Sequence, residues 1–183
     1  MSAAAFPHLP RRIVLAAVAA VLTLLALAPA QADARRCRHV NRDPNGISIH
    51  KVQTATLCLI NNKRRARGLH RVSENHRLDR ASMRYAQEMA SRNFFQHGDF
   101  VGRIKAVDYL AGAGSWTVGE NIAWGGGSYS TPKSIVRMWM NSPPHRANIL
   151  SSRFREIGIG IARGTPVPGV GGATYATDFG ARG

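Results

Sequence analysis

The segment 157–162, which reads IGIGIA, constrains the fold of this chain more than any other stretch. Successive side chains of a β-strand point to opposite faces, so isoleucine at alternate positions predicts a strand with one branched apolar face. The opposite face carries only two glycines and an alanine. Such a bare face allows a helix or a neighbouring side chain to approach the strand closely.

Upstream of this strand, several segments have apolar residues at helical spacing. This spacing predicts helices at residues 48–67, 75–92, 101–111 and 131–142. Asn75 is an expected N-cap, Thr131 followed by proline is a strong helix start, and the Pro-Pro pair after Ser142 ends the last helix sharply. A final strand is expected at residues 173–179. Helices followed by paired strands place the chain in the α+β class, most simply as a helix layer against a small sheet.

The first 34 residues are typical of a secretory signal peptide. Arg11 and Arg12 precede an apolar run at residues 13–28, and A-x-A cleavage sites follow it. The run is shorter than the roughly 20 residues that span a bilayer, so an anchor is the less favoured interpretation. We therefore expect a secreted, extracellular or cell-wall-associated protein with an N-terminal arm at residues 35–47 and one domain at residues 48–183.

The chain is strongly basic, with 25 Lys and Arg against 10 Asp and Glu. Removal of Arg11, Arg12 and Asp33 leaves 23 against 9, a net charge of +14. Outside a cell such a surface meets anionic polymers and lipid head groups, although scattered charges also serve solubility. The cations of the segment 63–67, KRRAR, suit a helix C-terminus and are typical of solvated surface.

Expected partners are anionic cell-envelope polymers, lipid or a small molecule. We expect no specific nucleic acid as a partner and no transmembrane helix after signal removal. We also expect the protein to be a monomer.

The two cysteines, Cys37 and Cys58, both follow the predicted signal peptide. An even number in an exported protein predicts one disulfide, which would tie the arm to the first helix. Closing a loop of about 20 residues stabilises a fold by roughly 3 kcal/mol in chain-entropy estimates. No companion histidine or CxxC spacing indicates a metal or redox role for them.

Three ionisable residues that are distant in the sequence lie beside predicted turns or helix ends: His97, Glu120 and His145. Two imidazoles and a carboxylate suit a divalent metal such as zinc with open positions, or general acid–base chemistry. On local grounds Glu120 is equally well explained as part of a turn, where it caps a helix or pairs with an arginine. No GxSxG motif is present, and GGGS at 125–128 is expected to be a plain loop.

Four stretches in order resemble the CAP superfamily, which comprises cysteine-rich secretory proteins, antigen 5 and pathogenesis-related 1 proteins, and in particular its small secreted bacterial branch. They read HRLDRASMRYAQEMASRNFFQHGD, GENIAWG, MWMNSPPHRANILSSRFREIGIG and YATDFG. The resemblance runs from about Thr54 to Gly180. It implies an α-β-α sandwich in which a central antiparallel sheet lies between helix layers.

The resemblance also implies a central cleft in which His97, Glu120 and His145 lie together, with the two histidines as metal ligands if a metal binds. Eukaryotic relatives carry a fourth acidic residue three positions after the helix tryptophan, where this chain has Ser142. Glu156 is the nearest acid in sequence, but no motif assigns it to the site. The missing acid and the lack of an evident nucleophile favour a secreted module that binds a small ligand, lipid or cell-envelope component. The alternative is a metal-assisted or acid–base hydrolase of cell-wall or peptide substrates, with His97, Glu120 and His145 as catalytic candidates.

Overall fold

The structure is a computed structural model that describes residues 36–183. The expected signal peptide at residues 1–34 therefore lies outside the described residues. The helices are α2 (Ile49–Arg65), α3 (His76–Ser91), α4 (Phe100–Lys105), α5 (Pro132–Asn141) and α6 (Pro143–Ile149), with short 3-10 turns η2 (Pro44–Gly46) and η3 (Gly127–Ser130). The strands are β1 (Ser73–Glu74), β2 (Trp116–Gly126), β3 (Glu156–Arg163) and β4 (Gly172–Arg182). None of the helices within residues 36–183 is long and apolar enough to cross a bilayer.

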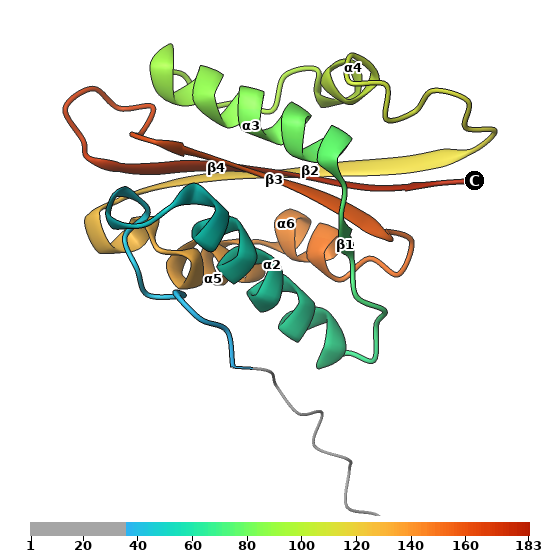
Figure 1. Cartoon of the computed structure of the whole chain (residues 1–183), viewed down its shortest axis with the longest axis horizontal. Coiled ribbons are helices and arrows are strands. Elements are labelled where there is room, and N and C mark those ends of the chain that lie inside the picture. The colour runs from blue at the N-terminus through green and yellow to red at the C-terminus, as the bar shows by residue number, and fades with distance from the viewer. Residues whose placement is uncertain (1–35) are drawn as a thin grey trace, which may run out of the picture. The chain divides into compact units, whose positions relative to one another are not determined.

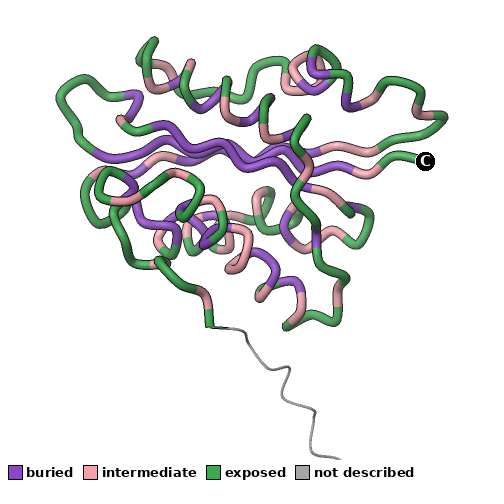
Figure 2. Tube along the Cα trace, viewed as in Figure 1, coloured by how far each residue is buried: buried purple, intermediate pink, exposed green. Residues whose placement is uncertain are grey.

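The four strands form one sheet in the order β1-β3-β4-β2, with helices on both faces. Figure 1 shows α3 and α4 over one face and α2, α5 and α6 over the other. This is the α-β-α sandwich that the resemblance implies. The simpler expectation of a single helix layer is wrong, because β4 is buried along almost its whole length and needs cover on both faces (Figure 2). The sheet is also mixed, since β1 pairs in parallel with β3.

The alternation in β3 determines how the two helix layers approach the sheet. Its isoleucines are buried in the core shared with α2 and α5. Its glycine face lies directly against the backbone of α3: a Cβ added to Gly158 would lie 2.0 Å from the carbonyl carbon of Leu78, and one added to Gly160 would lie 2.1 Å from that of Ser82. The bare face predicted from the sequence therefore serves close packing of a helix.

Several expected elements differ from the structure. The segment expected as a helix at 101–111 is helical only at 100–105 and continues as turns, in which Asp108 has a positive φ of 60°. The segment that contains Glu120 is a long strand, β2, and not a turn, and Gly125 and Gly126 belong to it rather than to a loop. The two prolines that end α5 also begin α6, because proline is tolerated in the first turn of a helix.

The disulfide expected between Cys37 and Cys58 is present, with a Cα–Cα distance of 5.7 Å. It attaches the N-terminal arm to α2. Hydrogen bonds to the body of the fold also hold the arm, among them those from Lys133 N to Val40 O, from Asn45 Nδ2 to Gly172 O and from Arg163 to Pro44 O and Ile47 O.

One arginine in the basic C-terminus of α2 is not a surface residue. Arg64 is fully buried and donates hydrogen bonds to the carbonyl oxygens of four residues: His70, Ile149, Ser151 and Phe154. These distances run from 2.8 to 3.2 Å. The side chain therefore joins α2 to the segment that leads from α6 into β3.

Candidate functional site

The three candidate residues lie together at the outer edge of the sheet, although each comes from a different part of the fold. Glu120 belongs to the edge strand β2, His97 to the loop that follows α3, and His145 to α6 on the opposite face. The Nδ1 atom of His97 lies 2.8 Å from Oε1 of Glu120. The ring centres of His97 and His145 are 6.1 Å apart, with the rings inclined by 31°.

The sequence GEN in β2 explains why α6 approaches this edge. Gly119 leaves room for α6, because an added Cβ would lie 2.9 Å from Oδ1 of Asn148. Asn148 donates to the backbone carbonyl of Glu120 at 3.0 Å and to Oδ1 of Asn121 at 2.9 Å. Asn121 in turn donates to the carbonyl of His145 at 3.0 Å. The two asparagines therefore attach α6 to β2 and position His145.

Both carboxylate oxygens of Glu120 already have partners. Arg103 of α4 donates to Oε2 at 2.5 Å and also to the carbonyl of His97 at 2.8 Å. The Glu120 side chain is 1% exposed, whereas that of His97 is 50% exposed. Burial raises the pKa of Glu120, and the positive charge of Arg103 opposes this shift. Glu120 is thus placed to orient His97.

His145 is held by Ser142, the residue between α5 and α6. Ser142 Oγ lies 2.8 Å from Nδ1 of His145. Burial lowers the pKa of His145, and repulsion from His97 adds to this shift, so the ring is neutral at neutral pH. With Nδ1 engaged in both rings, Nε2 of His97 and Nε2 of His145 are the nitrogens that remain for a ligand.

The described donors do not complete a metal site. Within residues 36–183 there is no cluster of three His, Cys, Asp or Glu side chains that could hold a metal ion. Zinc sites in proteins use three or four protein ligands, and the two imidazoles supply two. The residues therefore do not fit a resident zinc ion by themselves.

The remaining acid considered from the sequence, Glu156, lies elsewhere. It accepts hydrogen bonds from Asn75 Nδ2 and from the hydroxyl of Tyr109, both at 2.7 Å, and lies 3.9 Å from Arg182. These partners come from the N-cap of α3, from the turns after α4 and from β4, and none belongs to the histidine pair. Glu156 is therefore not placed to act as the fourth acid.

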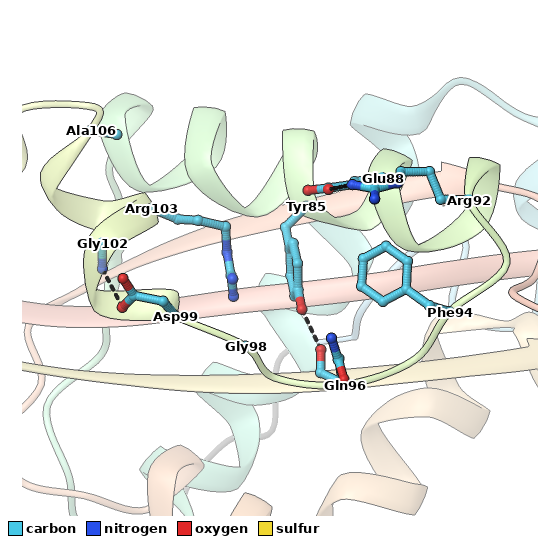
Figure 3. Close-up of a pocket in the computed structure, with 10 residues that line it drawn as sticks. All are labelled: Tyr85, Glu88, Arg92, Phe94, Gln96, Gly98, Asp99, Gly102, Arg103 and Ala106. Atoms are coloured by element: carbon cyan, nitrogen blue, oxygen red, sulfur yellow. Dashed lines mark hydrogen bonds and ion pairs between the residues drawn. The ribbon is translucent and has the colours of Figure 1, made fainter.

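Sequence reasoning missed Arg103, which lies between the site and a neighbouring pocket. Its guanidinium carbon is 3.2 Å from the centre of the Tyr85 ring. Figure 3 shows the two side chains side by side between α3 and α4. Both line a pocket of about 690 Å³. The pocket is lined by Arg103 and by the loop on either side of His97, but not by His97, Glu120 or His145 themselves. No local pattern marks Arg103, because its partner Glu120 is 17 residues away.

Comparison with known proteins agrees with this architecture. The sequence profile of the cysteine-rich secretory protein family matches residues 57–175. YkwD of Bacillus subtilis is 31% identical over 136 residues, which cover 72% of this chain and 49% of that protein. The chain thus spans about half the length of this relative.

Solved structures of low sequence identity share the fold. An outer surface protein of Borrelia burgdorferi superposes with a TM-score of 0.60 at 19% identity, over 75% of this chain and 97% of that one. An extracellular protein of Bacillus anthracis that contains an SCP domain gives a TM-score of 0.55 at 21% identity, over 73% of this chain and 43% of that one.

Proposed function

Because the chain belongs to the cysteine-rich secretory protein family, we propose that it is a secreted binding module whose histidine pair takes an anionic group of a small ligand, lipid or cell-envelope polymer. The observation that carries the proposal is the pair itself. Each imidazole is held through Nδ1, by Glu120 in one case and by Ser142 in the other, and the ring centres lie 6.1 Å apart. We therefore propose that the two Nε2 atoms bind one ligand. Both oxygens of Glu120 accept hydrogen bonds, so its part in this proposal is to hold His97 in place.

Charge and location support an anionic ligand from outside the cell. The chain without its predicted signal peptide carries a net charge of +14, which attracts phosphate and carboxylate groups. Two structural relatives are described as an outer surface protein and an extracellular protein, and the disulfide suits an oxidising compartment. A divalent cation such as zinc would have only the two imidazoles as ligands, and we propose it only as a companion of a bound ligand.

Replacing both His97 and His145 with alanine is expected to weaken binding of glycerol phosphate or soluble peptidoglycan fragments by about 10²-fold. Each lost hydrogen bond to a charged group is worth about 1.5–3 kcal/mol. Calorimetry with and without Zn²⁺ measures the affinity, with His50→Ala as the control because His50 is an exposed histidine of α2. Equal affinity of the double variant and the parent protein would refute the cleft as the binding site.

A hydrolase is the second candidate, and one observation favours it. The Glu120–His97 contact of 2.8 Å is the carboxylate–imidazole arrangement that orients a general base. In that case Glu120→Gln is expected to slow release of products from peptidoglycan or casein by about 10²-fold or more, because the amide no longer supports an imidazolium. Absence of products from the parent protein would leave binding as the function.

A further inference from the structure

The acid Asp178 lies behind the candidate site. It is the Cα partner of Glu120 across β2 and β4. Side chains of directly opposed residues share one face of a sheet, so both carboxyl groups are on the face covered by α3 and α4. Counted over the whole residue, Asp178 is 1% exposed and Glu120 is 5% exposed. Two acids are therefore buried side by side. Arg103 forms an ion pair with Glu120, and its positive charge also acts on Asp178.

The hydrogen bonds of these two acids differ. Glu120 has a donor on each oxygen, Arg103 on one and His97 on the other. Asp178 has a single side-chain contact, from the hydroxyl of Ser82 to Oδ2 at 2.8 Å. Its Oδ1 is buried and has no hydrogen-bond partner within residues 36–183. A buried carboxylate needs several donors to remain charged, so the surroundings of Glu120 favour the charged form more than those of Asp178 do.

The charged surroundings of Asp178 agree with this assignment. α4 contributes Arg103 and β2 contributes Glu120, whereas β3 presents Gly158 opposite Asp178 and α3 presents the neutral Ser82. Burial, together with the negative charge of Glu120, raises the pKa of Asp178 to about 7, against the opposing effects of Ser82 and Arg103.

We propose that Asp178 is a positioning residue of the site that carries a proton up to about pH 7, so that below this pH the Glu120–Asp178 pair holds one negative charge opposite Arg103. Glu120 then keeps its full interaction with Arg103 and its contact with His97. When Asp178 loses its proton, a second negative charge appears behind Glu120, and Arg103 is the cation that acts on both acids. The affinity of the site for an anionic ligand is therefore expected to fall as the pH rises above 7. This consequence rests on the proposed function.

Carbon-13 NMR of the protein labelled at its Asp and Glu carboxyl carbons tests the proton directly, without a ligand. We expect one Asp carboxyl to titrate near pH 7, to vanish in Asp178→Asn, and to persist in the control Asp108→Asn. Asp108 is an exposed residue whose φ of 60° asparagine also tolerates. A titration of Asp178 near pH 4, the usual range for Asp, would overturn the proposal.

Unfolding measurements give a second readout with a defined sign. The folded pKa of Asp178 is raised, so its contribution to stability is full below about pH 4 and is lost as the pH rises to about 7. The measured quantity is the unfolding equilibrium constant of the parent protein divided by that of Asp178→Asn. We expect this ratio to rise by up to about 10³-fold between pH 4 and pH 7. A ratio that does not change with pH would overturn the proposal, and if the variant does not fold, the NMR titration of the parent protein still decides.

These outcomes separate the proposal from the proposed function. In one outcome, the protein binds neither glycerol phosphate nor peptidoglycan fragments while one carboxyl titrates near pH 7. That result supports the protonation proposed for Asp178 and counts against the proposed function. Ligand binding that depends on His97 and His145, combined with an Asp178 that titrates near pH 4, supports the function and refutes this inference.

Discussion

Replacement of Arg64 by methionine is expected to lower the free energy of unfolding by about 4 kcal/mol. Methionine fills a similar volume but donates no hydrogen bond, so all four carbonyl groups lose the Arg64 donor, and the Phe154 carbonyl keeps a second donor from Arg155. Each buried polar group left unsatisfied costs about 1–3 kcal/mol, part of which local relaxation recovers. The loss is offset in part because methionine removes the cost of burying a charge that has no carboxylate partner among its hydrogen bonds. Chemical denaturation of the two proteins measures the difference.

Two further variants make the Arg64 result specific. Arg67→Met removes an exposed cation from the same basic segment and is expected to change stability by less than about 0.5 kcal/mol. Arg64→Lys keeps the charge but loses the planar fork that reaches several carbonyls at once, so it is expected to recover only part of the stability. If Arg64→Met were as stable as Arg67→Met, the buried hydrogen bonds would contribute nothing measurable.

Gly160→Ala is expected to destabilise the fold by about 3 kcal/mol. The new Cβ would lie 2.1 Å from the carbonyl carbon and oxygen of Ser82 in α3, which are backbone atoms that no rotamer change can move. Overpacking of this kind costs about 1–3 kcal/mol, and contact with backbone places it at the upper end. Because Ser82 also donates to Asp178, a shift of α3 should change the Asp178 carboxyl signal as well.

The matched control for this substitution is Gly171→Ala. An added Cβ at Gly171 meets no atom within 4 Å, and this glycine does not have a positive φ. The control is therefore expected to be neutral or slightly stabilising, since alanine lowers the entropy of the unfolded chain. Denaturant midpoints at a fixed pH compare the two variants. Equal midpoints would mean that α3 does not rest on the glycine face of β3.

Prediction from the sequence was most successful where the signal is local. The side-chain oxygen of Asn75 accepts from the backbone N–H groups of Arg77 and Leu78, which is the expected N-cap. Thr131 caps α5 through the N–H of Ser134. The segment around Glu120 was missed as a strand, because two buried polar residues interrupt its apolar pattern. Glu120 and Asn121 are buried there only because Arg103, His97 and Asn148 lie close enough to satisfy them.

The sequence by itself determined the helix boundaries set by caps and prolines, the two faces of β3, the disulfide, and the identity of the three candidate residues. It did so because each follows from spacing, backbone preference or a motif in adjacent positions. Only the tertiary structure decided what surrounds those residues. Arg64 is buried rather than solvated, Arg103 occupies the second oxygen of Glu120, and Ser82 meets Asp178 from 96 residues away. Such partners depend on which layers stack against which strand, and burial then sets the charge that each group carries.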